Sequence, residues 1–480
     1  MGKVLTNLAT VTICLLLLRL PIESHAGAIQ QHPNIEGNWL GTLRLPSDEE
    51  LKIVFRLVRQ DSGKLKGVLD SPDQYVFGVP IDVVAKENGH INLGGKAIGG
   101  GFEGTLTNES TLKGHWKQGG GSLPLVLRRV DSVPQPPERP QTPKPPFPYH
   151  QEEVSYPNPA ADDVTIAGTL TRPRSEGPFP AALLIAGSGP HDRDETVCMH
   201  RPFFVLADYL TRRGIAVLRV DKRGVGSSTG DYGKATMADF ASDVRAGIAY
   251  LRSREDVRAG EIGLIGHSAG ADVAAIVAAA SQDVSFIVMM AGTGVTGYQV
   301  IILQDLASAK SKGATDTELA LIRPVIERYY AVAVEEKDNE IAAKKMQRIY
   351  DEMTEEQKHA YRWLKNGWTN QIENCLSPGC RSTLQFDPKP HLIKVSCPVL
   401  AIIGEKDVQV IPNENLRGIR EALKAGGNEN HIVEELPSLN HLFQTADTGA
   451  LAEYVTIEET IAPIALEKIG DWVRKQTTIE

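Results

Sequence analysis

Residues 266–270 read Gly-His-Ser-Ala-Gly, a Gly-x-Ser-x-Gly pentapeptide between a strand-like and a helix-like segment. The preceding residues 261–265 (EIGLI) are typical of a short buried strand, and residues 271–280 (ADVAAIVAAA) are typical of a small-residue, apolar helix. A serine at such a turn is held with its hydroxyl exposed, and flanking glycines leave room for the tight backbone. The pentapeptide therefore predicts a nucleophilic serine, Ser268.

A second match to the pattern occurs upstream, at residues 226–230 (GSSTG). The residues after it, 231–233, are turn formers and do not begin a helix. We therefore interpret Ser228 as a loop residue and retain Ser268 as the candidate nucleophile.

A serine hydroxyl is a poor nucleophile at neutral pH and needs a base, normally a histidine whose second nitrogen is held by a carboxylate. Asp407 follows the strand-like residues 397–403, and His441 lies on the loop after the strand-like residues 431–435. The order serine, acid, histidine is the one that accompanies an elbow of this kind. The sequence therefore predicts that Ser268, Asp407 and His441 act together.

Each partner has an alternative. Glu405 is a competing carboxylate two residues before the candidate acid, and His191 is a competing base close to the expected site. Two other histidines are placed less well, because His267 lies inside the elbow and His431 lies in a strand.

Acyl transfer also requires hydrogen-bond donors for the developing oxyanion. We expect these to be the backbone N–H of Ala269 and that of Ser188, which lies in the glycine-containing loop 187–190. The next residues, 191–195 (HDRDE), are charged. They either tie their own loop down by ion pairs or bind a charged group of the substrate.

The chain has 480 residues, a net charge of −9 and no basic stripe, which disfavours nucleic acid as a partner. Residues 1–26 have a lysine, an apolar core and a small-residue cleavage site, so they are interpreted as a signal peptide. The apolar run is too short to span a bilayer and ends at Arg19. We expect an exported protein, periplasmic, cell-surface or secreted, without an integral membrane span in the mature chain.

Residues 30–131 show many short strands and glycine-rich turns, typical of a small all-β domain, either a barrel or a sandwich. Gly37-Asn38-Trp39 resembles the start of lipocalin-like barrels. Prolines favour an extended spacer over residues 132–149. Residues 150–480 alternate strands and helices, which predicts an α/β fold, with a charged helical cap inserted at about 296–392.

Four cysteines follow the signal segment. Cys375 and Cys380 are close enough in sequence to close a small loop in an oxidising compartment, so a disulfide between them is favoured and free thiols remain the alternative. No histidine at ligand spacing accompanies them, which disfavours a metal site.

Taken together, several segments resemble the α/β-hydrolase superfamily, in particular its bacterial branch of carboxylesterases and serine-aminopeptidase-like hydrolases. The β domain and the cap are similar to those of EstD-type esterases in that branch. These segments are residues 187–190, 221–228, 266–270 and 439–443.

The resemblance implies an α/β-hydrolase fold and a carboxylesterase that acts on a small-molecule ester without a metal or organic cofactor. Two alternatives stay open: a serine peptidase of the aminopeptidase-like kind, and a non-catalytic protein that binds a lipid or glycan. The acyl and alcohol specificity and the oligomeric state are not determined by these residues.

Overall fold

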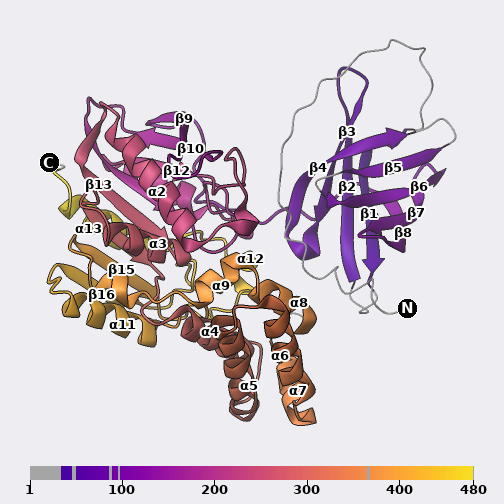
Figure 1. Ribbon diagram of the computed structural model, residues 1–480. Coiled ribbons are helices and arrows are strands. Elements are labelled where there is room, and N and C mark those ends of the chain that lie inside the picture. The colour runs from indigo at the N-terminus through magenta and orange to yellow at the C-terminus, as the bar shows by residue number, and fades with distance from the viewer. Residues whose placement is uncertain (1–33, 46–49, 86–88, 96–97, 365–367, 479–480) are drawn as a thin grey trace. The chain divides into compact units, whose positions relative to one another are not determined.

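The computed structural model describes residues 34–45, 50–85, 89–95, 98–364 and 368–478 (Figure 1). It divides the chain into two compact units, residues 1–138 and residues 139–480. The predicted signal peptide, residues 1–26, lies outside the described residues. No helix within the described ranges is long and apolar enough to cross a membrane.

The first unit is a closed antiparallel barrel in which each strand pairs with the next and β1 pairs with β8. A 3₁₀ turn, η2 (Pro72–Gln74), joins the third and fourth strands. The strands are β1 (Gly37–Arg44), β2 (Glu50–Arg59), β3 (Leu65–Ser71), β4 (Val76–Ala85), β5 (His90–Gly95), β6 (Gly100–Asn108), β7 (Thr111–Gln118) and β8 (Gly121–Val130). Of the two predicted architectures, the barrel is the one observed.

Large side chains fill the interior of the barrel. Trp39, Phe55 and Phe102 are fully buried, and Trp39 donates its indole N–H to the Ile35 carbonyl at 2.8 Å. The Arg129 guanidinium covers the Trp39 ring at 4.5 Å. A cavity of about 90 Å³ lies among the remaining core side chains, which is smaller than the roughly 300–1,000 Å³ of typical ligand pockets.

The second unit is built on one eight-stranded sheet with the order β16-β15-β14-β13-β11-β12-β10-β9. The pairs β9–β10 and β10–β12 are antiparallel, and the remaining pairs are parallel. The strands are β9 (His150–Pro157), β10 (Thr165–Arg172), β11 (Phe179–Ile185), β12 (Ala216–Val220), β13 (Val257–His267), β14 (Phe286–Met290), β15 (Val399–Gly404) and β16 (His431–Leu436). Strands β11, β14 and β15 are buried along their whole length, because helices cover both faces of the sheet.

Two hydrophobic cores lie on the two faces of this sheet. One core includes side chains of α2 (Met237–Arg252), α3 (Ala269–Ala278) and α11 (Pro412–Ala425). The other includes side chains of α1 (Pro202–Thr211) and α13 (Pro463–Lys475). A short helix, α12 (Glu453–Thr456), and a 3₁₀ turn, η4 (Tyr232–Lys234), lie in the connecting loops. The arrangement is the α/β-hydrolase fold that the sequence predicted.

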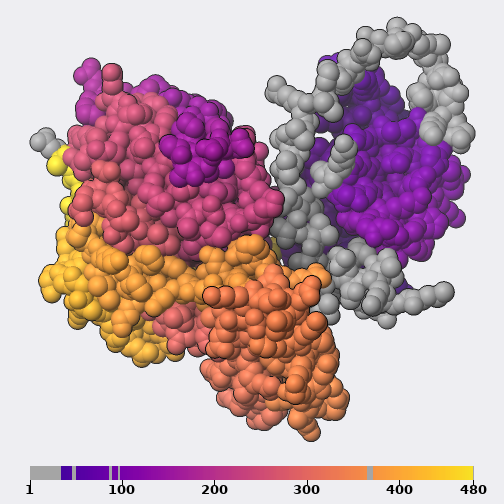
Figure 2. Space-filling view, viewed as in Figure 1, coloured from indigo at the N-terminus to yellow at the C-terminus, as the bar shows by residue number. Residues whose placement is uncertain are grey.

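Between β14 and β15 the chain forms a helical cap with a hydrophobic core of its own. Figure 2 shows the orange cap residues as a lobe projecting from the rest of the second unit. Thr296, Thr315 and Thr354 each begin a cap helix through a capping box. The helices are α4 (Gly297–Ser311), α5 (Asp316–Glu335), α6 (Asn339–Asp351), α7 (Glu355–Tyr361), α8 (Trp368–Cys375), α9 (Pro378–Leu384) and α10 (Lys389–Leu392).

Part of the segment predicted as a spacer, residues 132–149, contacts the second unit. From Arg139 onward the chain belongs to the second unit. Arg139 donates to the carbonyls of Cys198, Val455 and Ile457, and Gln141 donates to the Ile461 carbonyl at 2.7 Å. An extended proline-rich segment leaves its polar groups available for such contacts, and these bonds hold residues 139–141 against the second unit.

The disulfide predicted between Cys375 and Cys380 is not formed. All four described cysteines are free. The Cys375 and Cys380 thiols contact each other at the junction of α8 and α9, and this hydrogen bond together with burial raises the pKa of Cys375.

Candidate active site

The Gly-x-Ser-x-Gly segment forms a sharp turn between β13 and α3. Ser268 has φ 53° and ψ −126°, and its N–H donates to the Met290 carbonyl at 2.7 Å. A Cβ on Gly266 would lie 2.2 Å from the Gly270 carbonyl oxygen, and one on Gly270 would lie 2.0 Å from that of Ile185. Both positions therefore require glycine, and the strained serine is held at the C-terminal edge of the sheet.

Asp407 and His441 meet on the loops after β15 and β16. The His441 Nδ1 lies 2.7 Å from Asp407 Oδ2, and both side chains are buried. Asp407 Oδ1 accepts the backbone N–H groups of Gln409 and Val410 at 2.7 and 2.8 Å. These bonds hold the carboxylate in one orientation, which favours a His441 tautomer with the proton on Nδ1 and a free lone pair on Nε2.

The competing residues are occupied elsewhere. Glu405 accepts the Ser438 N–H at 2.8 Å, which fixes the turn before the histidine loop. The His191 Nε2 lies 2.7 Å from the Ser188 carbonyl oxygen, and the His431 Nδ1 lies 2.7 Å from that of Asn428. None of the three contacts the pair formed by Asp407 and His441 in the hydrogen bonds of the described residues.

Ser228, the serine of the second Gly-x-Ser-x-Gly match, forms hydrogen bonds that hold its own turn in place. The Ser228 hydroxyl donates to the Asp221 carbonyl at 2.8 Å and accepts the Ala167 N–H at 2.9 Å. The first contact reaches the residue after β12 and the second reaches β10, so this hydroxyl is occupied, and Ser228 is buried.

The two predicted oxyanion donors lie beside Ser268. Ser188, Ser268 and Ala269 line one cavity of about 170 Å³. Ala269 is the first residue of α3, where the N–H has no partner within the helix. Within the described residues, neither the Ser188 N–H nor the Ala269 N–H has an acceptor. Gly187 leaves space for this approach, because its Cβ would lie 3.1 Å from the Ser268 Cβ.

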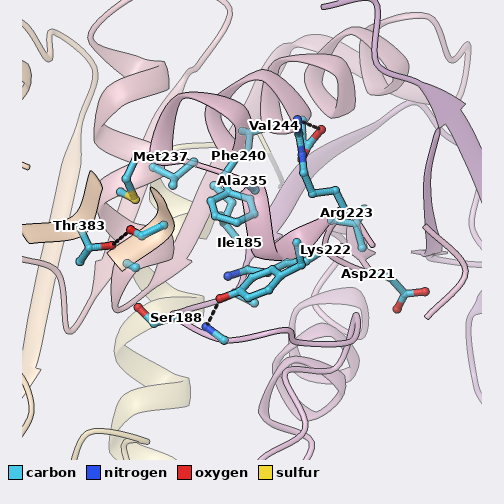
Figure 3. Close-up of a pocket in the computed structure, with 18 of the residues that line it drawn as sticks. Ile185, Ser188, Asp221, Lys222, Arg223, Ala235, Met237, Phe240, Val244 and Thr383 are labelled. Carbon is cyan, nitrogen blue, oxygen red and sulfur yellow. Dashed lines mark hydrogen bonds and ion pairs between the residues drawn. The ribbon is translucent and has the colours of Figure 1, made fainter. Parts of the chain in front are cut away.

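A larger cavity of about 650 Å³ adjoins the first and shares with it Ser188, Met237, Ala269, Ile301 and Thr383. Its wall is mostly apolar, from β11, α2 and the cap helix α9. Figure 3 shows Ser188 and Thr383 on its border and the Lys222 and Phe240 side chains facing each other within it. The Lys222 ammonium lies 4.8 Å from the Phe240 ring centre.

A buried pair, His267 and Glu195, joins the elbow to the two loops beside it. The His267 Nδ1 lies 2.9 Å from Glu195 Oε1, and its Nε2 lies 2.9 Å from the His441 carbonyl oxygen. Glu195 Oε1 also accepts the Gly187 N–H at 2.6 Å. The pair therefore connects three segments, which are the loop 187–190, strand β13 and the loop that carries His441.

Electrostatics favour charge on both members of this pair. Burial opposes the charge on His267, but the Glu195 carboxylate and the His441 carbonyl outweigh it and raise the pKa of His267. Burial likewise opposes the charge on Glu195, and His267 outweighs it, so the pKa of Glu195 is lowered. Nearby, burial lowers the pKa of Lys222 to about 8, although Glu195 opposes this.

Replacing Glu195 by glutamine is expected to lower the free energy of unfolding by about 3–5 kcal/mol, because it leaves His267 buried without its counter-charge. The pair stabilises the fold fully between the ordinary values of 4.5 for Glu195 and 6.5 for His267. This contribution falls as pH rises through the raised pKa of His267, and as pH falls through the lowered pKa of Glu195. Denaturant unfolding at about pH 5.5 and about pH 9 measures the difference, which should be larger at the lower pH. A loss of equal size at both would contradict an ion pair.

The carboxylates of the acidic run at residues 191–195 are held by partners in the run's own loop and on neighbouring elements. Asp192 accepts from the N–H and hydroxyl of Thr196 at 2.9 and 2.7 Å. Asp194 is paired with Arg201 and Arg219. The substrate-binding interpretation of this run is therefore not supported, because its carboxylates already have partners.

Residues 162–433, more than half of the chain, match the X-Pro dipeptidyl-peptidase (S15) family. The chain belongs to this family. Esterase EstD of Thermotoga maritima is 35% identical over 112 residues, which cover 23% of this chain and 27% of EstD. An uncharacterized 31.7 kDa protein of Escherichia coli is 25% identical over 248 residues, 49% of this chain and 76% of that protein. The S15-family chain thus spans about a quarter of the length of EstD.

Solved structures similar to this S15-family chain include an esterase of Pyrococcus furiosus, which is 17% identical. The two align over 68% of this chain and 91% of the esterase, with a TM-score of 0.41. Another is Est1E of Butyrivibrio proteoclasticus with bound ferulic acid, 15% identical, covering 67% and 98% with a TM-score of 0.40. The family match and EstD agree with the fold described above.

Proposed function

We propose that the protein hydrolyses carboxylic esters through an acyl-enzyme intermediate on Ser268. The observation that carries the proposal is the convergence at one edge of the sheet. There a strained serine lies beside two unpaired N–H donors, and a buried Asp407–His441 pair lies on the adjoining loops. Gln409 and Val410, which hold the Asp407 carboxylate, also line the cavity that contains Ser268.

In the first half-reaction, the Ser268 hydroxyl oxygen attacks the ester carbonyl carbon while His441 Nε2 takes its proton. The resulting oxyanion accepts hydrogen bonds from the Ser188 and Ala269 N–H groups. When the tetrahedral intermediate collapses, the bond to the alcohol oxygen breaks and His441 returns the proton to that oxygen. Water then attacks the acyl-enzyme with the same proton transfers, which releases the acid and regenerates Ser268. Asp407 orients His441 and stabilises its cationic form throughout.

The cavities support a substrate of moderate size. The 650 Å³ cavity lies within the range of small-molecule sites and has a mostly apolar wall. It adjoins the oxyanion loop at Ser188, so a substrate whose carbonyl lies beside Ser268 extends into it. We assign this cavity to the larger, apolar part of the ester.

A serine peptidase is the second candidate, and the family match favours it. The same serine, base and oxyanion donors would cleave an amide, with His441 protonating the leaving amine. The non-catalytic alternative has less support, because the barrel interior is packed around a cavity of only about 90 Å³.

The test combines labelling with a substrate comparison. A fluorophosphonate probe is expected to modify the peptide that contains Ser268 and to abolish activity in proportion to labelling. On the same preparation, kcat/KM for a short-chain aryl ester is compared with that for a dipeptide anilide with proline before the scissile bond. Higher activity on the ester supports the proposal, and activity on the anilide alone would replace it with the peptidase.

A further inference from the structure

One charged side chain of the nucleophile helix has no role in the mechanism above. Asp272 lies in the first turn of α3, one turn after Ser268, and is 4% exposed. It lines the same 170 Å³ cavity as Ser268 and is the only charged side chain among the described residues of that wall. The remaining wall combines apolar side chains with amides and hydroxyls, including Gln304 and Gln409.

The two carboxylate oxygens of Asp272 have different environments. Oδ1 accepts the N–H and the hydroxyl of Thr293 at 3.0 and 2.9 Å, which anchors the loop after β14 to the helix. Oδ2 has no hydrogen-bond partner among the residues that the structure describes. An asparagine oxygen would accept both Thr293 bonds equally well. Loop anchoring therefore explains one oxygen and leaves both the charge and the second oxygen unexplained.

A carboxylate in a buried side chain is costly when no counter-charge is near, so it either takes up a proton or binds a cation or a strong donor through its unpartnered oxygen. Burial raises the pKa of Asp272 to about 7, although the two Thr293 donors oppose this. Near neutral pH the group can therefore bind a cationic ligand as a carboxylate or accept a proton in its absence.

We propose that Asp272 is a specificity-determining residue that binds a protonated amine, or more weakly a hydroxyl, on the acyl part of the substrate. The proposal rests on the proposed function, because it places the ester carbonyl beside Ser268. The cavity volume is on the order of five or six water-sized groups, which fits an acyl group of three carbons with one polar substituent. The larger apolar part of the ester then occupies the adjoining 650 Å³ cavity.

From the sequence, the acidic run at residues 191–195 was the candidate for binding a charged group of the substrate. The carboxylates of that run already have partners in their own loop and on neighbouring elements, whereas Asp272 lines the cavity that contains Ser268. The predicted substrate class is therefore small amino-acyl esters, with hydroxy-acyl esters next and plain acyl esters last.

A matched series of benzyl esters tests this, namely propanoate, lactate and 3-aminopropanoate, followed at about pH 7 by release of benzyl alcohol. Asp272→Asn keeps an acceptor for Thr293 and removes the charge. We expect it to lower the ratio of kcat/KM for the aminopropanoate to that for the propanoate by about 10- to 100-fold, the range of a charge-assisted hydrogen bond. The ratio of the two esters, and not the absolute rate on either, is the quantity compared.

Thr293→Val is the control, because it removes one bond to Asp272 Oδ1 and leaves Oδ2 unchanged. The ratio of kcat/KM for the aminopropanoate to that for the propanoate should stay within about three-fold of wild type, a smaller change than the loss of one typical neutral hydrogen bond would give. Thermal unfolding of both variants checks that they fold. A ratio unchanged in Asp272→Asn, or reduced as much in Thr293→Val, would overturn the proposal.

Binding to a Ser268→Ala background separates this inference from the proposed function. Calorimetry there should show at least about ten-fold tighter binding of the aminopropanoate than of the propanoate, and the preference should disappear when Asp272→Asn is added. If wild type hydrolyses none of the esters yet this preference holds, the inference stands and the ester hydrolysis proposal fails. If the esters are hydrolysed without the preference, the inference fails alone.

Discussion

Replacing Ser268 by alanine is expected to lower kcat for ester hydrolysis by about 10⁴- to 10⁶-fold, because it removes the atom that forms the acyl-enzyme. The fold should be retained, since the Ser268 N–H that bonds to Met290 stays in place and the side chain caps no helix. Steady-state kinetics on a short-chain ester measure the loss, and fluorophosphonate labelling should disappear with it.

Ser228→Ala is the matched control because it alters the serine of the second Gly-x-Ser-x-Gly match. Its hydroxyl bridges Ala167 and Asp221, so the variant should lose about 1–3 kcal/mol of stability while kcat stays within a few-fold of wild type. If Ser228→Ala abolished hydrolysis and Ser268→Ala did not, the nucleophile would be misassigned.

Replacing Asp407 by asparagine should lower kcat by about 10⁴-fold, the loss seen when the acid of a serine–histidine–acid site becomes an amide. Asparagine can keep the two backbone bonds to Gln409 and Val410 through its oxygen. Its amide N–H₂ would then face His441 Nδ1, where Asp407 Oδ2 now lies at 2.7 Å. The histidine would be forced into the tautomer that carries its proton on Nε2, and that nitrogen could no longer accept the proton of Ser268.

Glu405→Gln separates this role from a general effect of acidic side chains after β15. Glu405 accepts only the Ser438 N–H in the described contacts, and glutamine preserves that acceptor. Its kcat should therefore remain close to that of wild type. The double variant Ser268→Ala, Asp407→Asn should be no slower than Ser268→Ala alone, because the two residues act as one unit. If the losses in kcat of the two single variants added up in the double variant, Ser268 and Asp407 would not act together.

Local patterns were sufficient for the main elements around the site. The strand before Ser268, the apolar helix after it and the two glycines predicted the turn, because each is a property of a few adjacent residues. The same holds for the loops that carry Asp407 and His441, since each follows a short strand. The closed barrel was one of two predicted architectures, because strand alternation alone does not determine whether the first strand pairs with the last.

Contacts between distant segments were not predictable in this way. Glu195 and His267 are 72 positions apart, and nothing local to either predicted that they pair in the interior. The proline-rich segment was expected to be a spacer because its composition indicates a stiff, extended chain. Composition does not indicate which distant residues Arg139 and Gln141 bind. The thiols of Cys375 and Cys380 have suitable sequence spacing for a disulfide, but both are free in the cap although they contact each other. For Asp272 a signal was present, since it is the one charge in an otherwise small and apolar helix.

The sequence by itself determined the hydrolase fold, the turn at Ser268 and the order of its expected partners, because these depend on short-range periodicity and on glycines that tight backbone contacts require. Only the tertiary structure decided which polar groups are already paired. It showed that the acidic run at residues 191–195 is paired with arginines and with its own loop, and that Asp272, which lines the cavity of Ser268, has one carboxylate oxygen without a partner in the described contacts. The physical reason is that the cost of a buried charge depends on its neighbours in space, which the order of residues does not reveal.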